Sequence, residues 1–318
     1  MLGIIILNYN NASATVDCVN SVLEHNTWPA KFILVDNAST DDSVSRLTSY
    51  LSESRPDDHA VFAEEDSFRL SELPRFSLVK AGVNGGYARG NNIGLRFAEK
   101  DDSLDLVMIL NNDILFIDDI IPLLARFVMD DANAGLVSPL LLKRDGKSLD
   151  YNCARKDCDL GDVALYYLFY CRDRKGILSR RANEKRMLYN DRSLLEKDAV
   201  PIELPSGSCM LVRKDHFRRA GYFDPETFLY YEENILYHRF RKLGLTNYLL
   251  PQLKCIHLGA ETTAKAVRDY DYLRKTNRSA YYYVMNYRDL NPFQKVFFFL
   301  LYNVYCLVLR VRQSTKRR

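Results

Sequence analysis

Residues 4–40, IIILNYNNASATVDCVNSVLEHNTWPAKFILVDNAST, contain the pattern that decides the fold class. Two apolar runs, Leu2 to Leu7 and Phe32 to Val35, each end in a polar cluster. Between them, residues 16–23 place apolar side chains at the spacing of a helix with one buried face. A strand, a helix and a second strand in this order predict a crossover connection, and such connections join parallel strands.

The same alternation continues to about residue 140. A second helical stripe, which Thr40 or Asp41 can cap, precedes predicted strands over Phe76 to Val79 and Leu104 to Leu110. The sequence therefore predicts an α/β fold, with a Rossmann-like, mixed but mainly parallel sheet and helices on both of its faces.

Polar residues follow three of these strands, at Asn8, at Asp36 and at Asn111-Asn112-Asp113. Ligands bind such sheets beyond the carboxyl ends of the strands. We therefore expect the three polar clusters to form one site.

The second half of the chain is less regular. From 145 to 200 the alternation stops, and we interpret this stretch as a variable, partly helical insertion over the sheet. A helix from Glu232 to Leu243 and a short strand from Leu253 to His257 follow, and the chain looks helical from residue 263 onward. These patterns divide the chain into a domain over 1–262 and a helical segment over 263–318.

Composition excludes several classes of protein. The net charge of +3 gives no reason to expect a nucleic-acid partner. The seven cysteines are scattered and form no CxxC pair, so they predict neither a zinc site nor disulfides and favour a reducing cytoplasm. No run reaches the roughly 18–20 apolar residues of a membrane-spanning helix. The first strand is followed by no glycine, which excludes a dinucleotide-binding fingerprint.

Four segments resemble the family 2 glycosyltransferases, in particular the rhamnosyltransferase-like branch of bacterial polysaccharide and O-antigen assembly. They are IIILNYNN with ILVDNAST, NGGYARGNNIG (84–94), MILNND (108–113), and GSCMLVRKDHFRRAGYFDPETFLYYEE (207–233) followed by His257. The resemblance covers about residues 1–260. It implies a GT-A fold and the inverting transfer of a hexose from a dTDP- or UDP-linked sugar to a lipid-linked or polysaccharide hydroxyl.

For the donor half of the site, the resemblance implies a divalent cation, Mg²⁺ or Mn²⁺, held by Asp113 and completed by His257. Only one carboxylate is present in Asn111-Asn112-Asp113, so the donor diphosphate must supply further ligands. The alternatives are a strand-ending turn at Asp113 and a structural role for His257.

The resemblance also implies a set of donor-binding residues. They are Leu7, Asn8, Tyr9, Asp36, Asn84, Tyr87, Arg89, Asn91, Asn112, Ser206 and Gly207. Among them Asp36 is expected to meet a pyrimidine or ribose, and Arg89 to contact diphosphate. The alternatives are a helix cap at Asp36 and a tight turn over residues 84–92.

On the acceptor side, the resemblance makes Glu233 the general base, with Glu232 beside it, and places Asp224 and Tyr231 near the acceptor. A carboxylate at a helix N-terminus also complements the macrodipole, and Asp224 can simply cap a turn. Family members often carry an acid where this chain has Ile235, and we expect its loss to leave Arg239 without an obvious partner.

The C-terminal stretch 296–309, VFFFLLYNVYCLVL, is followed by basic residues. Aromatic and basic residues together suit a bilayer interface. We expect peripheral attachment to the inner face of the cytoplasmic membrane, where a lipid-linked acceptor lies. The alternative is a helix packed on the catalytic domain or in a homodimer.

Two other functions stay open at this point. A catalytically inactive nucleotide-sugar-binding or scaffold protein of the same fold is suggested by the single carboxylate at Asp113 and by Ile235. A sugar-nucleotidyltransferase would need a glycine- and arginine-rich loop after the first strand, and that loop is absent.

Overall fold

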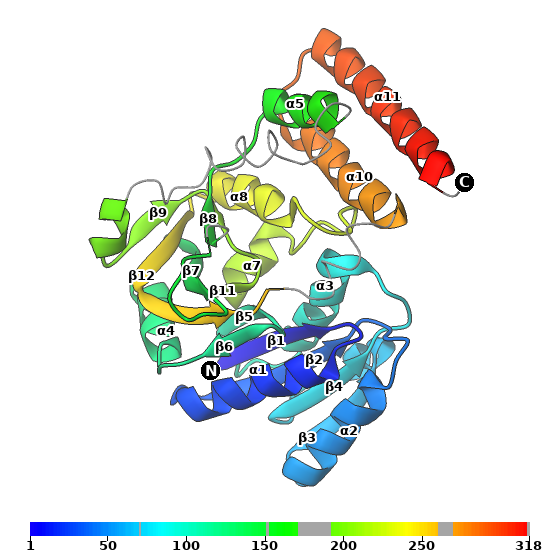
Figure 1. Ribbon diagram of the computed structural model, residues 1–318. Helices are drawn as coiled ribbons and strands as arrows, with labels where there is room; N and C mark the ends of the chain where they lie inside the picture. The colour runs from blue at the N-terminus through cyan, green and yellow to red at the C-terminus, as the bar shows by residue number, and fades with distance from the viewer. Residues whose placement is uncertain (70, 151–152, 171–191, 260–269, 317–318) are drawn as a thin grey trace.

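The structure is a computed structural model that describes residues 1–69, 71–150, 153–170, 192–259 and 270–316. Within these residues one ten-stranded sheet has the order β3-β4-β2-β1-β5-β11-β7-β12-β6, with β9 paired to β12 (Figure 1). Its strands are β1 (Leu2–Asn8), β2 (Ala30–Asp36), β3 (His59–Ala63), β4 (Phe76–Lys80), β5 (Leu106–Asn111), β6 (Ile114–Phe116), β7 (Ala134–Lys143), β9 (Val200–Ile202), β11 (Cys209–Arg213) and β12 (Thr246–His257).

The pairing is mainly parallel. Strand β1 is parallel to both β2 and β5, and β4 is parallel to β2 and β3. Strand β11 is antiparallel to its neighbours β5 and β7, while β7 and β12 are parallel. The predicted mixed, mainly parallel sheet is therefore confirmed.

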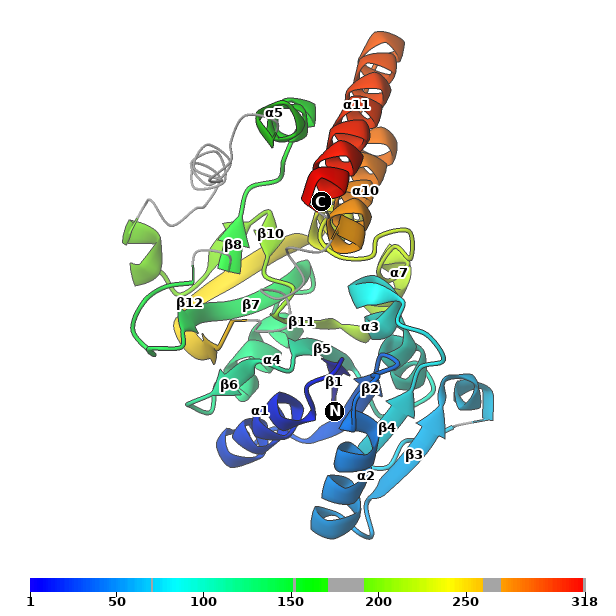
Figure 2. The ribbon, with the colours of Figure 1, turned by 45° about the vertical axis from the view of Figure 1, so that its right-hand side comes forward.

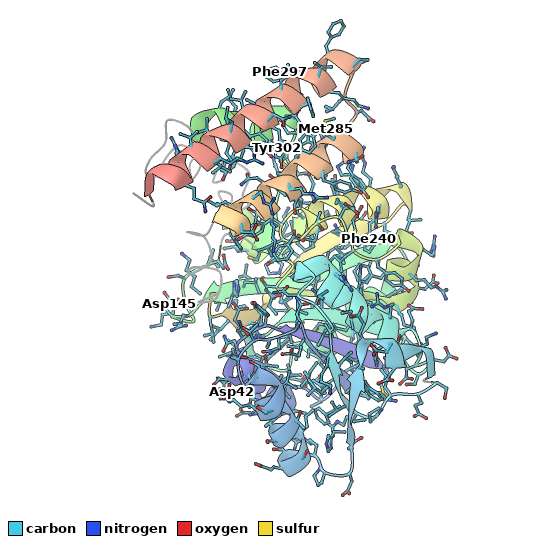
Figure 3. The ribbon with its side chains drawn as sticks, turned by 90° about the vertical axis from the view of Figure 1, so that its right-hand side faces the viewer. Asp42, Asp145, Phe240, Met285, Phe297 and Tyr302 are labelled. Carbon is cyan, nitrogen blue, oxygen red and sulfur yellow. The ribbon has the colours of Figure 1, made fainter. Side chains whose placement is uncertain are left out.

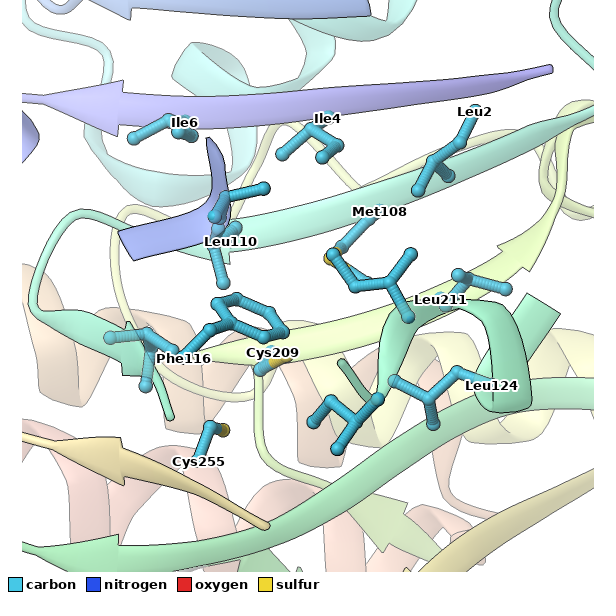
Figure 4. Packing of buried hydrophobic residues seen from close by; sticks show 14 of the residues in the cluster. Leu2, Ile4, Ile6, Met108, Leu110, Phe116, Leu124, Cys209, Leu211 and Cys255 are labelled. Atoms are coloured by element: carbon cyan, nitrogen blue, oxygen red, sulfur yellow. The ribbon is translucent and has the colours of Figure 1, made fainter. Parts of the chain in front are cut away.

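Helices cover both faces of the sheet. They are α1 (Ala12–His25), α2 (Ser43–Ser54) and α4 (Ile121–Asp130) on one face, and α3 (Gly86–Ala98), α7 (Lys214–Ala220) and α8 (Glu232–Lys242) on the other. Residues of β1 alternate between the two cores, since Ile4 belongs to the first and Ile5 to the second. Figure 4 shows the first core, where Ile4 and Met108 lie on neighbouring strands. Burial on both faces explains why β1 is apolar without alternation.

Several strands were not predicted, namely β3, β6, β7, β9 and β11, and β12 is longer than expected. Strand β3 is a short strand, HAVFA, at the edge of the sheet, and its side chains are at most partly buried. Strand β12 begins at Thr246 and not near Leu253; Pro251 falls where the register of its pairing with β7 shifts. Proline is tolerated in a strand at such an irregularity. Because a proline normally argues against a strand, the first half of β12 was not predicted.

The stretch 145–200 contains regular structure in its described part. Strand β8 (Ala154–Arg155) pairs with β10 (Leu204–Pro205), and helix α5 (Leu160–Tyr170) and the 3₁₀ helix η4 (Arg192–Glu196) follow β8. Residues 171–191, which carry most of the basic side chains of this stretch, lie outside the described residues.

Outside this stretch, a second 3₁₀ helix, η1 (Glu64–Arg69), follows β3. Within the described residues, no disulfide bond is present.

Two further helices, α10 (Tyr270–Tyr287) and α11 (Pro292–Lys316), lie beyond α8 on the side away from β3 (Figures 1 and 2). They pack with α5 around aromatic side chains. The ring of Tyr167 stacks on Tyr305 with a centroid separation of 4.6 Å, and Tyr281 stacks on Tyr302 at 4.3 Å. The boundary between domain and tail at residue 262 stays a prediction.

Helix α11 corrects one expectation. Within the described residues, Pro292–Gln313 is one helix that is long and apolar enough to cross a membrane by length and composition. The expectation that no segment reaches this length is wrong, because the helix extends the apolar stretch 296–309 at both ends, to Pro292 and Gln313. Figure 3 shows α11 at the outer edge of the molecule, with Tyr302 near α10.

A buried carboxylate after β8 links α10 to α8. Asp157 accepts hydrogen bonds from His238 on α8 at 2.9 Å, from Tyr283 on α10 at 2.7 Å and from Arg288 at 2.7 Å. Burial alone would raise the pKa of Asp157, but hydrogen bonds from His238, Asn234 and Tyr283 outweigh it and lower the pKa. Removing one partner of such a buried pair typically costs about 3–5 kcal/mol. The C-terminal helices are therefore fixed relative to α8.

Candidate functional site

The ends of β1 and β2 are joined by polar side chains. Asn8 is fully buried, and its Nδ2 donates to Asp36 Oδ2 at 2.8 Å. Both oxygens of Asp36 also accept from Ser39, at 2.9 Å from the backbone N–H and at 2.6 Å from the hydroxyl. Ala38, between them, has φ of 57°, which costs energy in a non-glycine residue. Asp36 thus fixes the loop after β2, while Asp41 accepts from Ser43 at the start of α2.

The loop before α3 is tied to the same place by Asn37. Its Nδ2 donates to Asn84 Oδ1 and to the carbonyl of Gly86, each at 3.1 Å. Gly86 has φ of 79°, and a Cβ there would lie 2.1 Å from the carbonyl oxygen of Phe228, so the position requires glycine. Residues 84–86 are therefore held against both the β2 loop and the segment before α8.

The predicted residues of α3 divide into two groups. Tyr87 points toward the segment before β11, where its hydroxyl donates to the carbonyl of Gly207 at 2.6 Å. Asn91 is fully buried, with its Nδ2 on the carbonyl of Tyr87. Arg89 is half exposed and lies near Glu64 of η1, with 3.7 Å between NH2 and Oε1. The structure does not bring Arg89 together with the other predicted residues.

The end of β5 carries the predicted metal residue. Asn112 Nδ2 donates to Thr15 Oγ1 at 3.1 Å, which fixes the turn against α1. Asp113 is buried, and its Oδ2 lies 3.3 Å from His257 Nε2, although the two residues are far apart in sequence. On its other side, His257 Nδ1 lies 2.6 Å from Asp150 Oδ2. Burial alone would lower the pKa of His257, but the two carboxylates outweigh it and raise the pKa to about 10.

The side chains at Asp113 fit a divalent cation. Oδ1 of Asp113 is buried and has no hydrogen-bond partner, so one carboxylate oxygen is left for a ligand. His257 offers a second donor atom beside it, and a metal would displace its proton. Within the described ranges, no group of three or more His, Cys, Asp or Glu side chains is arranged to hold a metal by itself. Substrate oxygens and water would have to complete the coordination, as is common for Mg²⁺.

The predicted base lies at the start of α8. Two consecutive non-glycine residues, Tyr230 and Tyr231, have φ of 68° and 72°, so the chain turns sharply before the helix. Glu232 is almost fully buried, and its Oε1 has no hydrogen-bond partner. Burial and the neighbouring Glu233 raise the pKa of Glu232 to about 8. At neutral pH Glu232 is therefore mostly protonated.

Glu233 faces the segment before β11. Its Oε1 accepts from the backbone N–H of Gly207 at 3.0 Å, and its Oε2 lies 3.6 Å from Arg155 NH2. A Cβ at Gly207 would lie 2.6 Å from Glu233 Oε1 and 3.0 Å from the hydroxyl oxygen of Tyr87. Glycine therefore lets the carboxylate approach the backbone closely. The structure therefore brings the predicted site residues Glu233, Gly207 and Tyr87 into contact.

The other predicted acceptor residues have structural partners. Asp224 is buried and accepts from Arg239 at 3.0 Å, from Tyr282 at 3.1 Å and from Tyr287 at 2.5 Å. The expectation that Arg239 lacks a partner is wrong, because Asp224 supplies the carboxylate that position 235 does not. The ring of Tyr231 lies 5.5 Å from that of Tyr283 on α10. Asp224 and Tyr231 therefore both contact the C-terminal helices.

Three residues of this region were not predicted, namely Asn37, Asp150 and Arg155. Asn37 follows Asp36 directly in the motif ILVDNAST, so its place at a strand end was a usable signal. Asp150 and Arg155 lie in the variable stretch and meet His257 and Glu233 only through the fold. The remaining donor residues Leu7, Tyr9 and Ser206 lie at the ends of β1 and β10, beside the described contacts.

Comparison with known proteins places this site in a family. Residues 3–221 match the family described as glycosyl transferase family 2. A low-salt glycan biosynthesis hexosyltransferase, Agl10 of Haloferax volcanii, is 24% identical over 242 residues, which are 76% of this chain and 62% of that protein. An N-acetylglucosaminyl-diphospho-decaprenol L-rhamnosyltransferase of Mycobacterium tuberculosis is 25% identical over 251 residues, which are 74% of this chain and 69% of the relative.

Solved structures show the same fold at low sequence identity. A mannosyltransferase from Pyrobaculum calidifontis, in complex with GDP-Man and Mn²⁺, has a TM-score of 0.51 at 16% identity, covering 99% of this chain and 79% of the other. GalNAc-T7 with UDP, GalNAc and Mn²⁺ has a TM-score of 0.55 at 14% identity, covering 95% of this chain and 54% of the other. These likenesses confirm the predicted GT-A architecture. Since the family match spans more than half of its length, the chain belongs to glycosyl transferase family 2.

Proposed function

We propose that the protein transfers a hexose, with inversion at the anomeric carbon, from a dTDP- or UDP-linked sugar to a hydroxyl of a lipid-linked acceptor. The family and the hexosyltransferase and rhamnosyltransferase relatives support the reaction class. The chain spans 62% of the Haloferax volcanii relative, so the substrates are inferred from this chain's own site as well.

One observation carries the proposal. The segment Ser206-Gly207-Ser208 joins the two halves of the predicted site. Ser208 accepts at its carbonyl from the N–H of Asn111, two residues before Asp113, at 2.8 Å, while Gly207 donates to Glu233 at 3.0 Å. The strand end that leads to the predicted metal residue and the predicted base are thus bonded to adjacent residues of one short segment. A donor diphosphate at Asp113 and an acceptor hydroxyl at Glu233 would then face each other across one sugar.

The reaction requires the protein to stabilise the departing diphosphate and to remove a proton from the acceptor hydroxyl. A cation bound at Asp113 and His257 would supply charge neutralisation for the departing diphosphate. Glu233 takes the proton of the acceptor hydroxyl as its oxygen bonds to the anomeric carbon, and the bond to diphosphate breaks on the opposite side. Gly207 directs one oxygen of Glu233, and protonated Glu232 adds no second negative charge beside it. No second nucleophile is required, so a single displacement inverts the configuration.

The nucleotide is the part of the donor that a binding measurement identifies first. We expect UDP- or dTDP-sugars to raise the melting temperature in the presence of Mg²⁺ or Mn²⁺, because ligand binding stabilises the native state by mass action. GDP-sugars serve as the comparison. Thermal shift of the full chain measures this, and a protein that no nucleotide sugar stabilises with either metal would contradict the proposed donor site.

The outer face of α11 supports a membrane-bound acceptor. Most of its exposed apolar side chains lie on the face opposite Phe298, Tyr305 and Leu309, which are buried against α5 and α10. They are Phe293, Val296, Phe297, Leu300, Val304, Leu307 and Val311, and Phe299 is exposed as well. Arg310 and Arg312 follow near the end of the helix. Figure 3 shows Phe297 on this outer edge. Because α11 packs along the protein, we propose that it lies in the membrane surface at the inner face of the cytoplasmic membrane.

Replacing Leu300 and Leu307 together by glutamate should release the protein from anionic vesicles. The two leucines are 57% and 61% exposed, so the change leaves the folded core intact. Burying each leucine in lipid contributes about 1.5–3 kcal/mol, so partitioning should weaken by roughly 10²-fold or more. Vesicle co-sedimentation at a fixed lipid concentration measures the effect.

The matched control changes Leu123 and Met129 to glutamate, which are similarly exposed apolar residues on α4. This variant should sediment as the wild type does. Equal sedimentation of the α11 variant and the wild type would exclude α11 as the membrane contact. A change of mass in solution without loss of sedimentation would instead assign this face to a homodimer.

A further inference from the structure

The contact between Asp150 and His257 has no part in the reaction described so far. Asp150 is buried in the loop after β7, and its Oδ2 lies 2.6 Å from His257 Nδ1. The opposite ring nitrogen, Nε2, lies 3.3 Å from Asp113 Oδ2. The imidazole therefore lies between two carboxylates, one at each nitrogen.

The two carboxylates are not equivalent. Asp113 keeps one buried oxygen without a hydrogen-bond partner and lies at the end of β5, where the donor diphosphate is expected. Asp150 lies on the far side of the ring, away from that oxygen. When a histidine binds a metal through one nitrogen, the other nitrogen almost always donates to a carboxylate, a carbonyl or water. The arrangement at His257 has this form, with Nε2 directed toward the cation position.

Asp150 is itself rigidly held. Its backbone N–H donates to the carbonyl of Leu141 on β7 at 2.9 Å, and its carbonyl accepts from Cys153 N–H at 3.2 Å. His257 ends β12, which pairs with β7 through a register that places His257 beside Lys143. Two neighbouring strands thus determine the distance between the carboxylate and the ring. Sites supported in this way keep their geometry without the ligand.

We propose that Asp150 is a positioning residue for the metal: it fixes the tautomer and orientation of His257 so that Nε2 is presented, with Asp113, to the cation that binds the donor diphosphate. The inference rests on the proposed function. It adds a residue outside the family motifs, in the variable stretch 145–200, to the machinery of the donor site.

Metal affinity tests the proposal without relying on turnover. The full-length protein is titrated with Mn²⁺ in the presence of UDP and, in parallel, of dTDP, and free Mn²⁺ is measured by electron paramagnetic resonance. Loss of such an outer carboxylate typically weakens metal binding by about 10–100-fold. We expect a loss of this size for Asp150→Ala and a smaller loss for Asp150→Asn, whose amide oxygen still accepts from Nδ1.

Asp145 provides the matched control. It lies in the same loop, at the edge of the molecule (Figure 3), and its carboxylate accepts from Ser148 and from the N–H of Lys147. Asp145→Ala loosens the loop without touching the ring, so its Mn²⁺ affinity should match the wild type. Melting temperatures of all variants show whether each is folded.

The outcomes separate the two proposals. If the wild type binds Mn²⁺ with either nucleotide and Asp150→Ala binds it equally well, Asp150 has no role toward the metal. The same conclusion follows if Asp145→Ala loses as much affinity as Asp150→Ala. If the wild type binds no Mn²⁺ with UDP or dTDP, the metal-dependent donor site fails, and the role of Asp150 fails with it.

Discussion

Glu233→Gln should lower turnover by about 10²–10⁴-fold, the usual loss on removing a general base, while donor binding is retained. Glutamine keeps the shape of the side chain and can still accept from the N–H of Gly207, so the segment 206–208 stays in place. Steady-state rates of sugar transfer, together with the thermal shift given by the nucleotide sugar, measure both quantities.

The neighbouring acid provides the sharpest control for this variant. Since the pKa of Glu232 is raised to about 8, Glu232 is mostly protonated at pH 7, and Glu232→Gln replaces a neutral group by another neutral group. We expect little change at pH 7. Above pH 8, wild-type Glu232 ionises and this variant does not, so the two rates should diverge there. A large loss for Glu232→Gln at pH 7 with little loss for Glu233→Gln would reverse the assignment of the base.

Asp113→Asn should abolish the metal-dependent part of donor binding and lower kcat/KM by roughly 10²–10³-fold. A metal that polarises phosphate oxygens contributes several kcal/mol, and each 1.36 kcal/mol is a factor of ten in rate. The asparagine is isosteric but carries no charge for the cation. Thermal shifts by the nucleotide sugar, measured with Mn²⁺ and with a chelator, should become equal in this variant.

The control for Asp113 is Asp130→Asn, an exposed aspartate at the end of α4. It should keep the full difference between Mn²⁺ and chelator. The pair Glu233→Gln and Asp113→Asn also separates the two halves of the site, because only the second is expected to weaken donor binding. An Asp113→Asn enzyme with unchanged kcat/KM would remove Asp113 from the metal site.

The sequence predicted that the polar clusters at Asn8, Asp36 and Asn111-Asn112-Asp113 lie together, because each follows a strand; their role in donor binding stays a prediction. The apolar runs before Asn8, Asp36 and Asn111 mark buried parallel strands, and the ends of parallel strands meet at one edge of the sheet. Three apolar runs, each followed by polar residues, were therefore enough to predict that these polar residues lie close together. Edge strand β3, the first half of β12 and strand β7, whose apolar run contains Ser138 and Pro139, were missed.

The rest of the site depends on contacts between distant parts of the chain. Asp150 meets His257 across 107 positions, and Arg155 meets Glu233 from a two-residue strand in the variable stretch. No local periodicity marks a carboxylate whose partner lies so far away. Arg239 shows the same limit, since its partner Asp224 lies in the preceding loop and not at position 235.

The most direct test of the account is the configuration of the product. The full-length protein is incubated with the nucleotide sugar that stabilises it best, a divalent cation and a panel of polyprenyl-diphosphate-linked sugars in detergent micelles, and the lipid product is analysed by mass spectrometry and NMR. We predict one added hexose or deoxyhexose whose anomeric configuration is opposite to that of the donor, formed by the wild type and strongly reduced in Glu233→Gln. A product that retains the donor configuration, or one formed equally by Glu233→Gln, would contradict the account.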